Sequence, residues 1–443
     1  MSPRSAVPKG ARTAARQGEG TPMSSTAVVS ARVPAAAFAV VLGGVSAALH
    51  LGKLPPAVPA LQASLGIGLV EAGFLLALVQ VASMTLGLAA GLAADTIGLR
   101  RSMLTGLVVL TVASLLGGGI GAGLFGGAHA VQWLLFLRAI EGIGFLLAVM
   151  PGPGLIRALT PAGADKAALG VWGSYMPLGV ALALLLGPAL IAWGGWGDWW
   201  WALSAVSAAA ALWLWSAVPA DGVRSVATGS GIPGGWPSRL RATVGARAPW
   251  MVASSFAVYS AQWMAVIGFL PAIYSGAGVP TGWNAVLTAI AAAMNIVGNL
   301  AGGRWLQRGV APERLLQWGF VTMALGGVAA FAQVGQGADA LGLPPALRYA
   351  AVCAFSLGGG MVPATLFLLG VRLAPGPDTV STTVGLMQQA SSLGQFLAPP
   401  AVAWVAHRAG GWHWTWAATL ACSLAGMALA RRLGRIRLPA EVA

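Results

Sequence analysis

The chain has 443 residues, of which 57% are hydrophobic and only 8% are charged, whereas soluble proteins carry about 25% charged residues. So few charges cannot cover the surface of a water-soluble fold of this size. The net charge of +14 comes from arginines scattered at the ends of apolar segments, without the dense basic stripe interleaved with aromatics that marks a nucleic-acid partner. The composition therefore predicts a protein of the lipid bilayer that binds no nucleic acid.

The chain begins with a polar stretch. Residues 1–31 are basic and rich in Pro, Gly and Ala, and we expect them to form a disordered cytoplasmic tail. Either Met1 or Met23 can serve as the start. A second short tail is expected at 433–443, and a polar cytoplasmic linker at 219–249.

Between these polar stretches lie segments of the roughly 20 apolar residues that a helix needs to cross a bilayer. In 32–218 we expect six, at about 33–54, 71–93, 102–124, 131–153, 167–192 and 199–218. In 250–432 we expect six more, at about 250–272, 284–306, 313–334, 346–370, 381–406 and 413–430. The segments exceed the length of barrel strands and lack their alternation. The prediction is an all-α polytopic membrane protein with twelve transmembrane helices in two six-helix bundles.

The basic residues predict the orientation, because Lys and Arg concentrate on the cytoplasmic side of membrane proteins. With the N-terminus inside, 21 of the 25 Lys and Arg fall on the inside. Lys53, Arg348 and Arg408 fall outside, and Arg138 lies within a helix. We therefore expect both termini and the linker to be cytoplasmic, in a multi-pass protein of the cytoplasmic (inner) membrane.

Glycines recur at matching positions in the two halves. Gly87, Gly91 and Gly98 return as Gly298, Gly302 and Gly309 at one constant offset, and Gly170 and Gly179 return as Gly385 and Gly394 at a similar one. Parallel repeats of this kind build transporters with the substrate site between pseudo-symmetric halves. Because small residues let helices approach closely, Gly87–Gly91 and Gly298–Gly302 are expected to pack the second and eighth segments tightly across the interface between halves.

The loop after the second segment reads Gly91-Leu-Ala-Ala-Asp95-Thr-Ile-Gly98-Leu-Arg100-Arg101. It resembles the G-x-L-x-D-x-x-G-x-R-[RK] signature of the major facilitator superfamily, and a generic positive-inside loop is the alternative. The resemblance implies the major facilitator fold and a gate motif, Gly91, Asp95, Gly98, Arg100 and Arg101, that stabilises one closed state. The corresponding loop at 302–309 lacks the acid.

Arg138-Ala-Ile-Glu141-Gly-Ile-Gly144 in the fourth segment resembles the R-x-x-x-G-x-G motif that the same family uses in proton coupling. Arg138 and Glu141 are three residues apart, so they share a helix face and can pair. Charges in membrane helices face the bundle interior or a wet cavity. Glu141, with Arg138, is therefore the proton-coupling candidate, and a purely structural ion pair is the alternative.

Two further resemblances are weaker. Gly179 to Pro188 resembles part of the G-x-x-x-G-P-x-x-G-G motif of drug–proton antiporters, but Ala183 replaces a glycine and Ile191-Ala192 replace the last two. The stretches at 50–56 and 172–179 resemble the cyanate/nitroimidazole permease branch of the superfamily.

These motifs indicate a secondary transporter that moves a small anion or polar organic molecule by alternating access, coupled to protons. A drug/proton antiporter for lipophilic compounds and a non-transporting membrane sensor are the alternatives. No metalloprotease motif, P-loop or paired intramembrane Asp residues occur, so we expect neither an enzyme, nor a metal, nor a cofactor. The expected partners are a small-molecule substrate, a proton and the bilayer, with the monomer as the functional unit.

The substrate cavity candidates are polar and aromatic residues inside the segments. Each can also serve as interhelical glue. They are His50, Lys53, Gln80, Trp172, Tyr175, Tyr259, Gln262, Asn295, Asn299, Gln388 and Gln389.

Overall fold

A computed structural model describes residues 34–67, 69–161, 164–221, 235–333, 342–409 and 411–436. All of them belong to one unit of the chain, Val33–Ala443. The disordered tail predicted at 1–31 lies outside the described residues, as does most of the tail predicted at 433–443.

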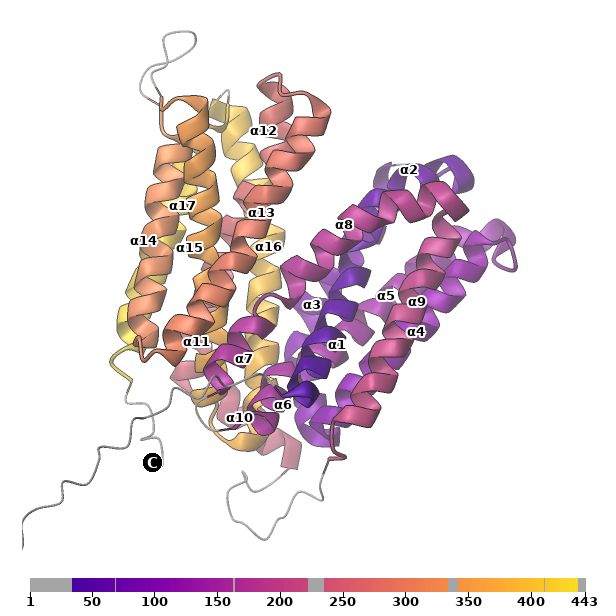
Figure 1. The fold of residues 1–443 in the computed structure, drawn as a ribbon, viewed down its shortest axis with the longest axis horizontal. Coiled ribbons are helices and arrows are strands. Elements are labelled where there is room, and N and C mark those ends of the chain that lie inside the picture. Colours follow the sequence, from indigo (N-terminus) through magenta and orange to yellow (C-terminus); the bar gives the residue numbers. More distant parts are fainter. Residues whose placement is uncertain are drawn as a thin grey trace, which may run out of the picture. The chain divides into compact units, whose positions relative to one another are not determined.

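The N-terminal bundle contains six membrane-spanning stretches, drawn from indigo to magenta in Figure 1. Three of them are split into two helices that continue one another. In chain order the elements are α1 (Ala35–Gly52), α2 (Leu54–Leu65), α3 (Leu69–Ile97), α4 (Leu99–Gly121), η1 (Gly127–His129), α5 (Ala130–Val149), α6 (Gly152–Leu159), α7 (Asp165–Trp172), α8 (Tyr175–Gly194) and α9 (Trp196–Ala217).

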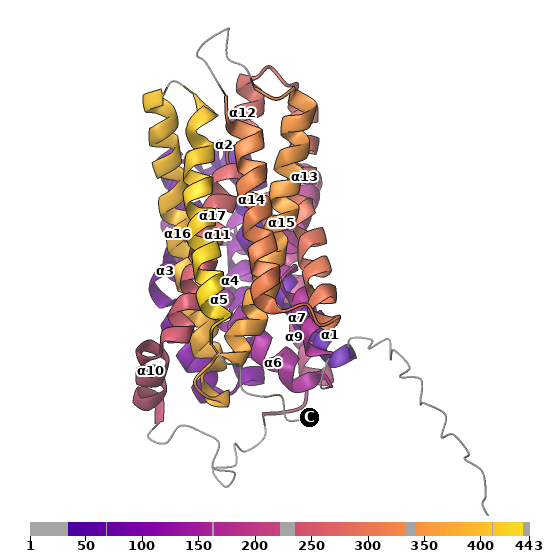
Figure 2. The same cartoon turned by 90° about the vertical axis from the view of Figure 1, so that its left-hand side faces the viewer.

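The C-terminal bundle follows after α10 (Gly235–Gly245), a short helix within the predicted linker. Figure 2 shows this bundle from its own side, with α14 and α17 toward the viewer. Its elements are α11 (Arg247–Ile267), α12 (Leu270–Gly276), α13 (Thr281–Gln307), α14 (Pro312–Phe331), α15 (Pro345–Arg372), η4 (Pro377–Thr379), α16 (Val380–Ala409), η5 (Trp412–Trp414) and α17 (Thr415–Leu433).

The predicted fold class is confirmed. Ten stretches of the described residues are helices long and apolar enough to cross a membrane. The remaining two of the twelve, α16 and α17, have ample length but a more polar composition, such as the run Ser381-Thr382-Thr383 in α16. These hydroxyls are buried inside the protein, where they are not exposed to lipid.

A proline lies just after the break in each of the four broken spans. The second helix of each broken span carries a proline in its first turn, namely Pro55 in α2, Pro153 in α6, Pro177 in α8 and Pro271 in α12. A proline has no N–H to donate and its ring collides with the carbonyl one turn earlier, so it is favoured where a helix starts and disfavoured within one. Proline alone does not predict a break, however, because Pro188, Pro363, Pro399 and Pro400 lie inside helices that continue past them.

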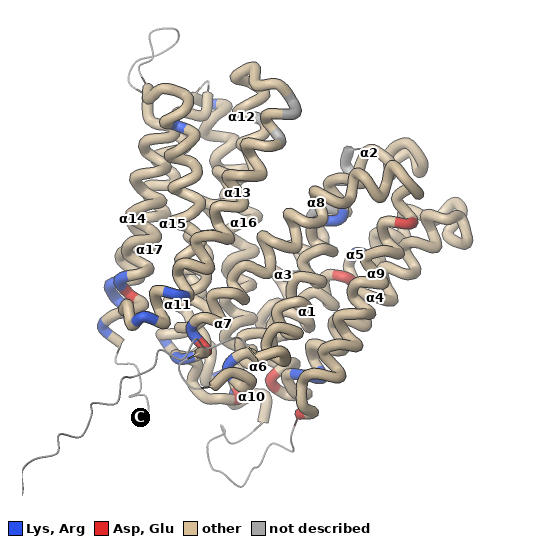
Figure 3. Tube along the Cα trace, in the orientation of Figure 1, with Lys and Arg blue, Asp and Glu red and all other residues tan. Residues whose placement is uncertain are grey.

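Lys and Arg gather at one end of the helices, which we call the arginine-rich end (Figure 3); it carries Arg100, Arg101, Arg157 and Arg308. The opposite end carries α2 and α12 (Figure 1). Contacts between the bundles run mainly along two pairs of helices, α3 with α16 and α7 with α13, and α6 and α8 add further contacts.

Glycines make both of these contacts possible. At Gly87 a Cβ would meet the backbone of Gly385, and at Gly91 it would collide with the backbone of Ser381. Gly170 of α7 lies equally close to Gly303 of α13. The prediction that Gly87 and Gly91 pack across the interface between halves is confirmed, with the eleventh span as partner.

The same prediction is wrong for the repeat-related pair in the second half. At Gly298 a Cβ would meet Leu357 and Gly360 of α15, and at Gly302 it would meet Met361. These two glycines therefore pack α13 inside the C-terminal bundle. The pattern shows that a neighbour must be close, but it does not show which helix that neighbour is.

We expect Gly91→Val to open the arginine-rich end. The added side chain collides with the backbone of α16, and overpacking of this kind costs roughly 1–3 kcal/mol. That cost is enough to lower the population of the state in which α3 and α16 are in contact by about tenfold. Spin labels at Thr96 and Gln307, in a background without Cys353 and Cys422, should report a longer distance. Gly276→Val is the control, because nothing lies within 4 Å of a Cβ at Gly276; an unchanged distance in Gly91→Val would contradict the role of this contact.

Candidate functional site

A cluster of charged side chains lies inside the N-terminal bundle. His50 comes from the last turn of α1 and Lys53 from the break between α1 and α2, while Arg138 and Glu141 come from α5. All four side chains are buried, with Lys53 0% and Glu141 2% exposed. We call these four residues the charged cluster.

Glu141 holds the cluster together because its two oxygens accept from two different cations. Lys53 Nζ donates to Oε1, and Arg138 Nη1 donates to Oε2 at 2.9 Å. The pairing of Arg138 with Glu141 predicted from their spacing is thus confirmed. With these three groups ionised the cluster carries a formal charge of +1.

Each cation has further partners. Arg138 donates from Nη1 to the carbonyl of His50 at 2.6 Å and from Nε to that of Leu75 at 3.1 Å. Lys53 Nζ also lies 3.3 Å from Ser114 Oγ and 4.6 Å from the centroid of a Trp200 ring. The two cations therefore connect α1 and α2 to α3, α4, α5 and α9.

His50 connects the cluster to α9. Its Nε2 lies 2.7 Å from Ser207 Oγ, which is in turn 2.9 Å from Ser46 Oγ. Its Nδ1 faces Glu141 Oε1 at 3.8 Å. His50 is thus the third group of the cluster that faces Glu141.

The structure corrects the position assigned to Lys53. The charge count placed it on the outside, although it was also a cavity candidate within the first segment; it lies in a buried break of the first span, paired with Glu141. Pro55 and Pro56 lie in the first turn of α2, which continues the first span beyond Lys53. The outside share of the basic residues therefore falls by one, to Arg348 and Arg408.

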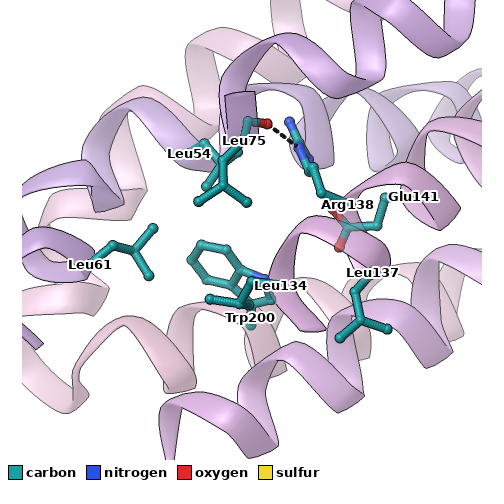
Figure 4. A pocket seen from close by; sticks show the side chains of 8 residues that line it. All are labelled: Leu54, Leu61, Leu75, Leu134, Leu137, Arg138, Glu141 and Trp200. Atoms are coloured by element: carbon teal, nitrogen blue, oxygen red, sulfur yellow. Dashed lines mark hydrogen bonds and ion pairs between the residues drawn. The ribbon is translucent and has the colours of Figure 1, made fainter. Parts of the chain in front are cut away.

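A small cavity adjoins the cluster (Figure 4). It has about 10 Å³ of free volume and is lined by Arg138 and Glu141 together with Trp200 and leucines of α2, α3 and α5. That is room for about one water molecule. Arg138 Nη2 is buried and has no hydrogen-bond partner among the described residues, so one strong donor of the cluster is unused.

A second polar group lies in the C-terminal bundle. Asn295 Nδ2 donates to Tyr259 Oη at 3.0 Å and to the carbonyl of Ser356 at 3.2 Å, and Asn299 Nδ2 donates to Asn295 Oδ1 at 3.0 Å. Asn299 also reaches the other bundle, since a Cβ at Gly173 would collide with its Oδ1. This network, Tyr259, Asn295 and Asn299, therefore extends to the interface between the bundles.

Trp172 and Tyr175 flank the break between α7 and α8, close to Gly173. Their rings stack with centroids 4.5 Å apart. Both lie against α1, because a Cβ at Gly44 would meet both rings. The same helix α1 thus contacts the aromatic pair at Gly44 and enters the charged cluster at His50.

The four glutamines among the candidates do not form one site. Gln80 donates to Gln395 Oε1 at 3.1 Å, and Gln389 accepts from the backbone N–H of Leu88 at 3.1 Å, so both join α3 to α16. Gln262 accepts from Ser423 of α17 at 2.9 Å. Gln388 lies 3.4 Å from Ser392 of its own helix. Gln80, Gln389 and Gln262 therefore join two helices, as the alternative of interhelical glue expects, while the contact of Gln388 stays within α16.

In the gate motif, Asp95 contacts the other bundle, whereas Gly98, Arg100 and Arg101 make contacts within their own bundle. Asp95 crosses the interface: Oδ1 accepts from the N–H of Ser381 at 3.1 Å, and Oδ2 accepts from the N–H and the hydroxyl of Thr382 at 2.6 and 2.7 Å. These groups form the first turn of α16, where the helix dipole favours a negative charge. The carboxylate therefore clamps α3 to α16 at the arginine-rich end.

Gly98, Arg100 and Arg101 act within the N-terminal bundle. Gly98 has φ +110°, a backbone conformation that favours glycine, and it lets α4 start directly after α3. The N–H groups of Arg100 and Arg101 donate to Asp221 at 3.0 and 2.9 Å, and Arg100 Nη2 donates to the carbonyl of Trp215. Asp221 thus caps α4 and joins it to the end of α9.

The linker helix reinforces the Asp95 contact. Arg239 of α10 donates from Nε to Asp378 Oδ2 at 2.9 Å and from Nη1 to the carbonyl of Asp95 at 3.2 Å. Nearby, Arg157 of α6 donates to the carbonyl of Val371 at 3.2 Å. Three arginine- or aspartate-mediated contacts therefore hold the bundles together at this end.

Comparison with protein families identifies the fold. A model of the Major Facilitator Superfamily matches residues 36–399. The chain belongs to the major facilitator superfamily. That family consists of transporters, so the protein is a secondary membrane transporter and not an enzyme.

Solved structures of major facilitator transporters share this fold. One is FucP in the outward conformation, with a TM-score of 0.71 and 16% identity over 91% of this chain and 99% of that chain. A second is the N162A variant of FucP, the E. coli fucose:proton symporter, with a TM-score of 0.69 and 16% identity over 91% of this chain and 98% of that chain. Another is the proton:xylose symporter XylE, with a TM-score of 0.71 and 15% identity over 91% of this chain and 95% of that chain. No curated protein sequence matches the chain.

Several residues of these sites escaped prediction. Ser114 and Ser207 contact the charged cluster, and the only sign of them in the sequence is a hydroxyl within an apolar helix. Ser381 and Thr382 contact Asp95 largely through backbone, which leaves no mark in the sequence. In the sequence, Asp221 cannot be distinguished from any other acid in a loop, because its contact with α4 depends on the tertiary structure.

We expect Glu141→Gln to destabilise this transporter by about 3–5 kcal/mol, because removing one partner leaves buried charge uncompensated. Lys53→Met combined with Glu141→Gln restores the formal charge of the cluster to +1 and should regain a large part of the loss. Thermal unfolding in detergent measures both, with Glu71→Gln on an exposed position of α3 as the control. Equal loss in the single and double variants would contradict a charge-based role for the pair.

Proposed function

We propose that this transporter moves a small anion or a small polar organic molecule across the cytoplasmic membrane by alternating access, coupled to protons through Glu141. The observation that carries the proposal is the buried charged cluster, with a formal charge of +1 and an unused donor on Arg138. Ionisable groups inside a membrane protein are expensive, and they mark substrate or proton pathways.

Glu141 is the proposed proton carrier. Its carboxylate is the counter-charge of both Lys53 and Arg138. Adding a proton removes that counter-charge from both cations at once, which weakens the ion pair between α5 and Lys53 at the break, while Arg138 keeps its hydrogen bonds to the carbonyls of His50 and Leu75. Proton binding at one carboxylate thereby changes the packing of the first and fourth spans.

The coupling prediction concerns transport by Glu141→Gln. We expect it to abolish proton-driven accumulation while leaving exchange or downhill flux, because the amide binds no proton in the physiological range. Uptake into proteoliposomes under an imposed proton gradient measures accumulation, normalised to folded protein. The double variant Lys53→Met with Glu141→Gln should also fail to accumulate, which separates loss of the proton site from loss of stability. Accumulation at the wild-type level in either variant would refute the role of Glu141.

The proposed solute contacts lie around the aromatic pair and the network of Tyr259, Asn295 and Asn299. Gly173, which lies between the two aromatic residues in the chain, approaches Asn299. Trp172 Nε1, Ser174 Oγ and Asn299 Oδ1 are buried without hydrogen-bond partners among the described residues. Unsatisfied buried polar groups are costly, and a polar solute that bonds to them would offset that cost.

Helix α1 provides a physical route between the solute contacts and the proton site. It touches Trp172 and Tyr175 at Gly44 and carries His50 into the charged cluster. A change in charge at Glu141 therefore acts on the same rigid helix that the solute contacts pack against.

Two alternatives are less well supported. A drug/proton antiporter for lipophilic cations needs a free acid in its pocket, but both oxygens of Glu141 already bind cations. A non-transporting sensor has no feature in its favour, and solute uptake by the purified protein would exclude it.

The substrate prediction uses counterflow with a panel of small monovalent anions, neutral polar solutes and lipophilic cations. We expect an anion or a small polar solute to exchange, and Lys53→Ala to reduce the rate by at least about tenfold, since the cluster loses its positive surplus. Transport of lipophilic cations that is indifferent to Lys53→Ala would favour drug efflux instead.

We further propose that the protein belongs to the cyanate/nitroimidazole permease branch of the superfamily. The two stretches that carry this resemblance include His50 and Lys53 in one case and Trp172 and Tyr175 in the other. These are the residues that form the charged cluster and the aromatic pair. The resemblance is therefore concentrated at the proposed site.

The proposed orientation places the arginine-rich end in the cytoplasm, with both termini, because Lys and Arg concentrate on that side (Figure 3). The contacts made by Asp95, Arg157 and Arg239 then close the cytoplasmic side. This supports an outward-facing state, in line with the similarity to FucP in its outward conformation. We propose that the monomer carries out this cycle.

The orientation predicts the outcome of cysteine labelling in intact cells. A single cysteine at Arg241 or Arg247, in a background without Cys353 and Cys422, should resist an impermeant reagent, whereas Arg408→Cys at the opposite end should react. Permeabilised cells provide the control for reactivity. Labelling at 241 or 247 in intact cells would overturn the topology.

A further inference from the structure

A second, larger pocket lies at the arginine-rich end of the C-terminal bundle. It has a volume of about 680 Å³ and is formed by the turn from α10 to α11 and the end of α17. Helix α11 packs on both α10 and α17. The lining residues are Gly245, Ala246, Arg247, Trp250, Met251, Arg432, Arg435 and Ile436. We call this site the arginine pocket; it is separate from the charged cluster and from the interface between the bundles.

The pocket is strongly cationic. Arg247, Arg432 and Arg435 contribute three positive charges, and no acid is among the lining residues. All three arginines are exposed, and none forms an ion pair or side-chain hydrogen bond with another described residue. Three guanidinium groups that line one pocket, from the start of α11, the last turn of α17 and the turn after it, form a site for a phosphate group, because the planar fork of arginine matches two phosphate oxygens.

The rest of the lining is apolar and suited to the membrane interface. Met251 and Ile436 provide aliphatic surface, and Trp250 is 46% exposed. The Trp250 Nε1 donates to the carbonyl of Val244 at 2.8 Å, which orients the ring at the turn. Tryptophans with one polar and one apolar edge concentrate at the level of lipid headgroups.

The neighbouring helix α10 has the same character. Trp236 is 57% and Val244 38% exposed on this helix, which also carries Arg239 and Arg241. Exposed tryptophans beside arginines are typical of the headgroup layer of a membrane. The arginine pocket therefore opens beside a helix suited to the headgroup layer.

We propose that the arginine pocket binds the phosphate headgroup of an anionic phospholipid, with the guanidinium groups on the phosphate and with Met251 and Ile436 against the start of the acyl chains. The shared chemistry is that of a phosphate-bearing anion, which could also be soluble. The adjoining apolar lining and the exposed tryptophans assign it to a lipid, since basic pockets between transmembrane helices on the cytoplasmic side accept such headgroups.

The test counts phosphatidylglycerol molecules bound to the full-length protein by native mass spectrometry and measures their apparent affinity. The pocket variant is Arg247→Gln, Arg432→Gln and Arg435→Gln. The matched control is Arg304→Gln, Arg308→Gln and Arg314→Gln, which removes the same charge from three exposed arginines of the same end. Each arginine near an anionic headgroup strengthens binding by roughly fivefold, so we expect the pocket variant to lose at least about tenfold in affinity and the control to lose little.

Further measurements distinguish a lipid headgroup from a soluble phosphate and show that the pocket variant is folded. Phosphatidylcholine should bind no more weakly to the pocket variant than to the wild type, and soluble glycerol phosphate at the same concentration should not displace phosphatidylglycerol. Unchanged thermal unfolding in zwitterionic detergent shows that the pocket variant is folded, and replacement of the three arginines by lysine should restore part of the affinity. Equal losses in the pocket and control variants, or full displacement by glycerol phosphate, would overturn the assignment.

Discussion

The carboxylate of Glu141 is the constraint on which the N-terminal bundle depends. A lysine and an arginine in a membrane interior are tolerated only with a counter-charge, and Glu141 provides it for both. Because Lys53 sits where the first span breaks, this single acid also fixes how α1 continues into α2. The arrangement brings five of the six spans of the bundle to one point, and it makes the packing of that bundle sensitive to the charge of one group.

The second constraint on the structure is the contact between the two bundles. It includes close approaches at glycines, and hydrogen bonds at the arginine-rich end in which Asp95 accepts from α16 while Arg157 and Arg239 donate to carbonyls. Gln80 and Gln389 add hydrogen bonds between α3 and α16. Hydrogen bonds to charged groups are strong but few, and glycine contacts contribute packing without interlocking side chains. Such an interface is firm in one state yet can be released as a whole, which suits a transporter that alternates between two states.

The sequence predicted the architecture well because the bilayer imposes it. Segment lengths, the six-plus-six layout and the pairing of Arg138 with Glu141 all follow from hydrophobic length and helix periodicity. The burial of Lys53 and the partners of Gly298 and Gly302 depend on which helices become neighbours, and periodicity does not contain that information. Helix α10 falls within the predicted linker because that stretch of the sequence is polar, although Trp236, Leu240 and Val244 recur at helical spacing.

The Asp95 contact also bears on how freely α16 can change over evolutionary time. Two of its three donors are main-chain amides of Ser381 and Thr382, and every residue except proline supplies such an amide. Substitutions at these two positions therefore leave most of the clamp intact, provided that the side chain still fits beside Gly91. The contact therefore constrains the two helices unequally. On α3 both the acid Asp95 and the glycine Gly91 must be kept. On α16 the main requirement is that the helix starts at the right place.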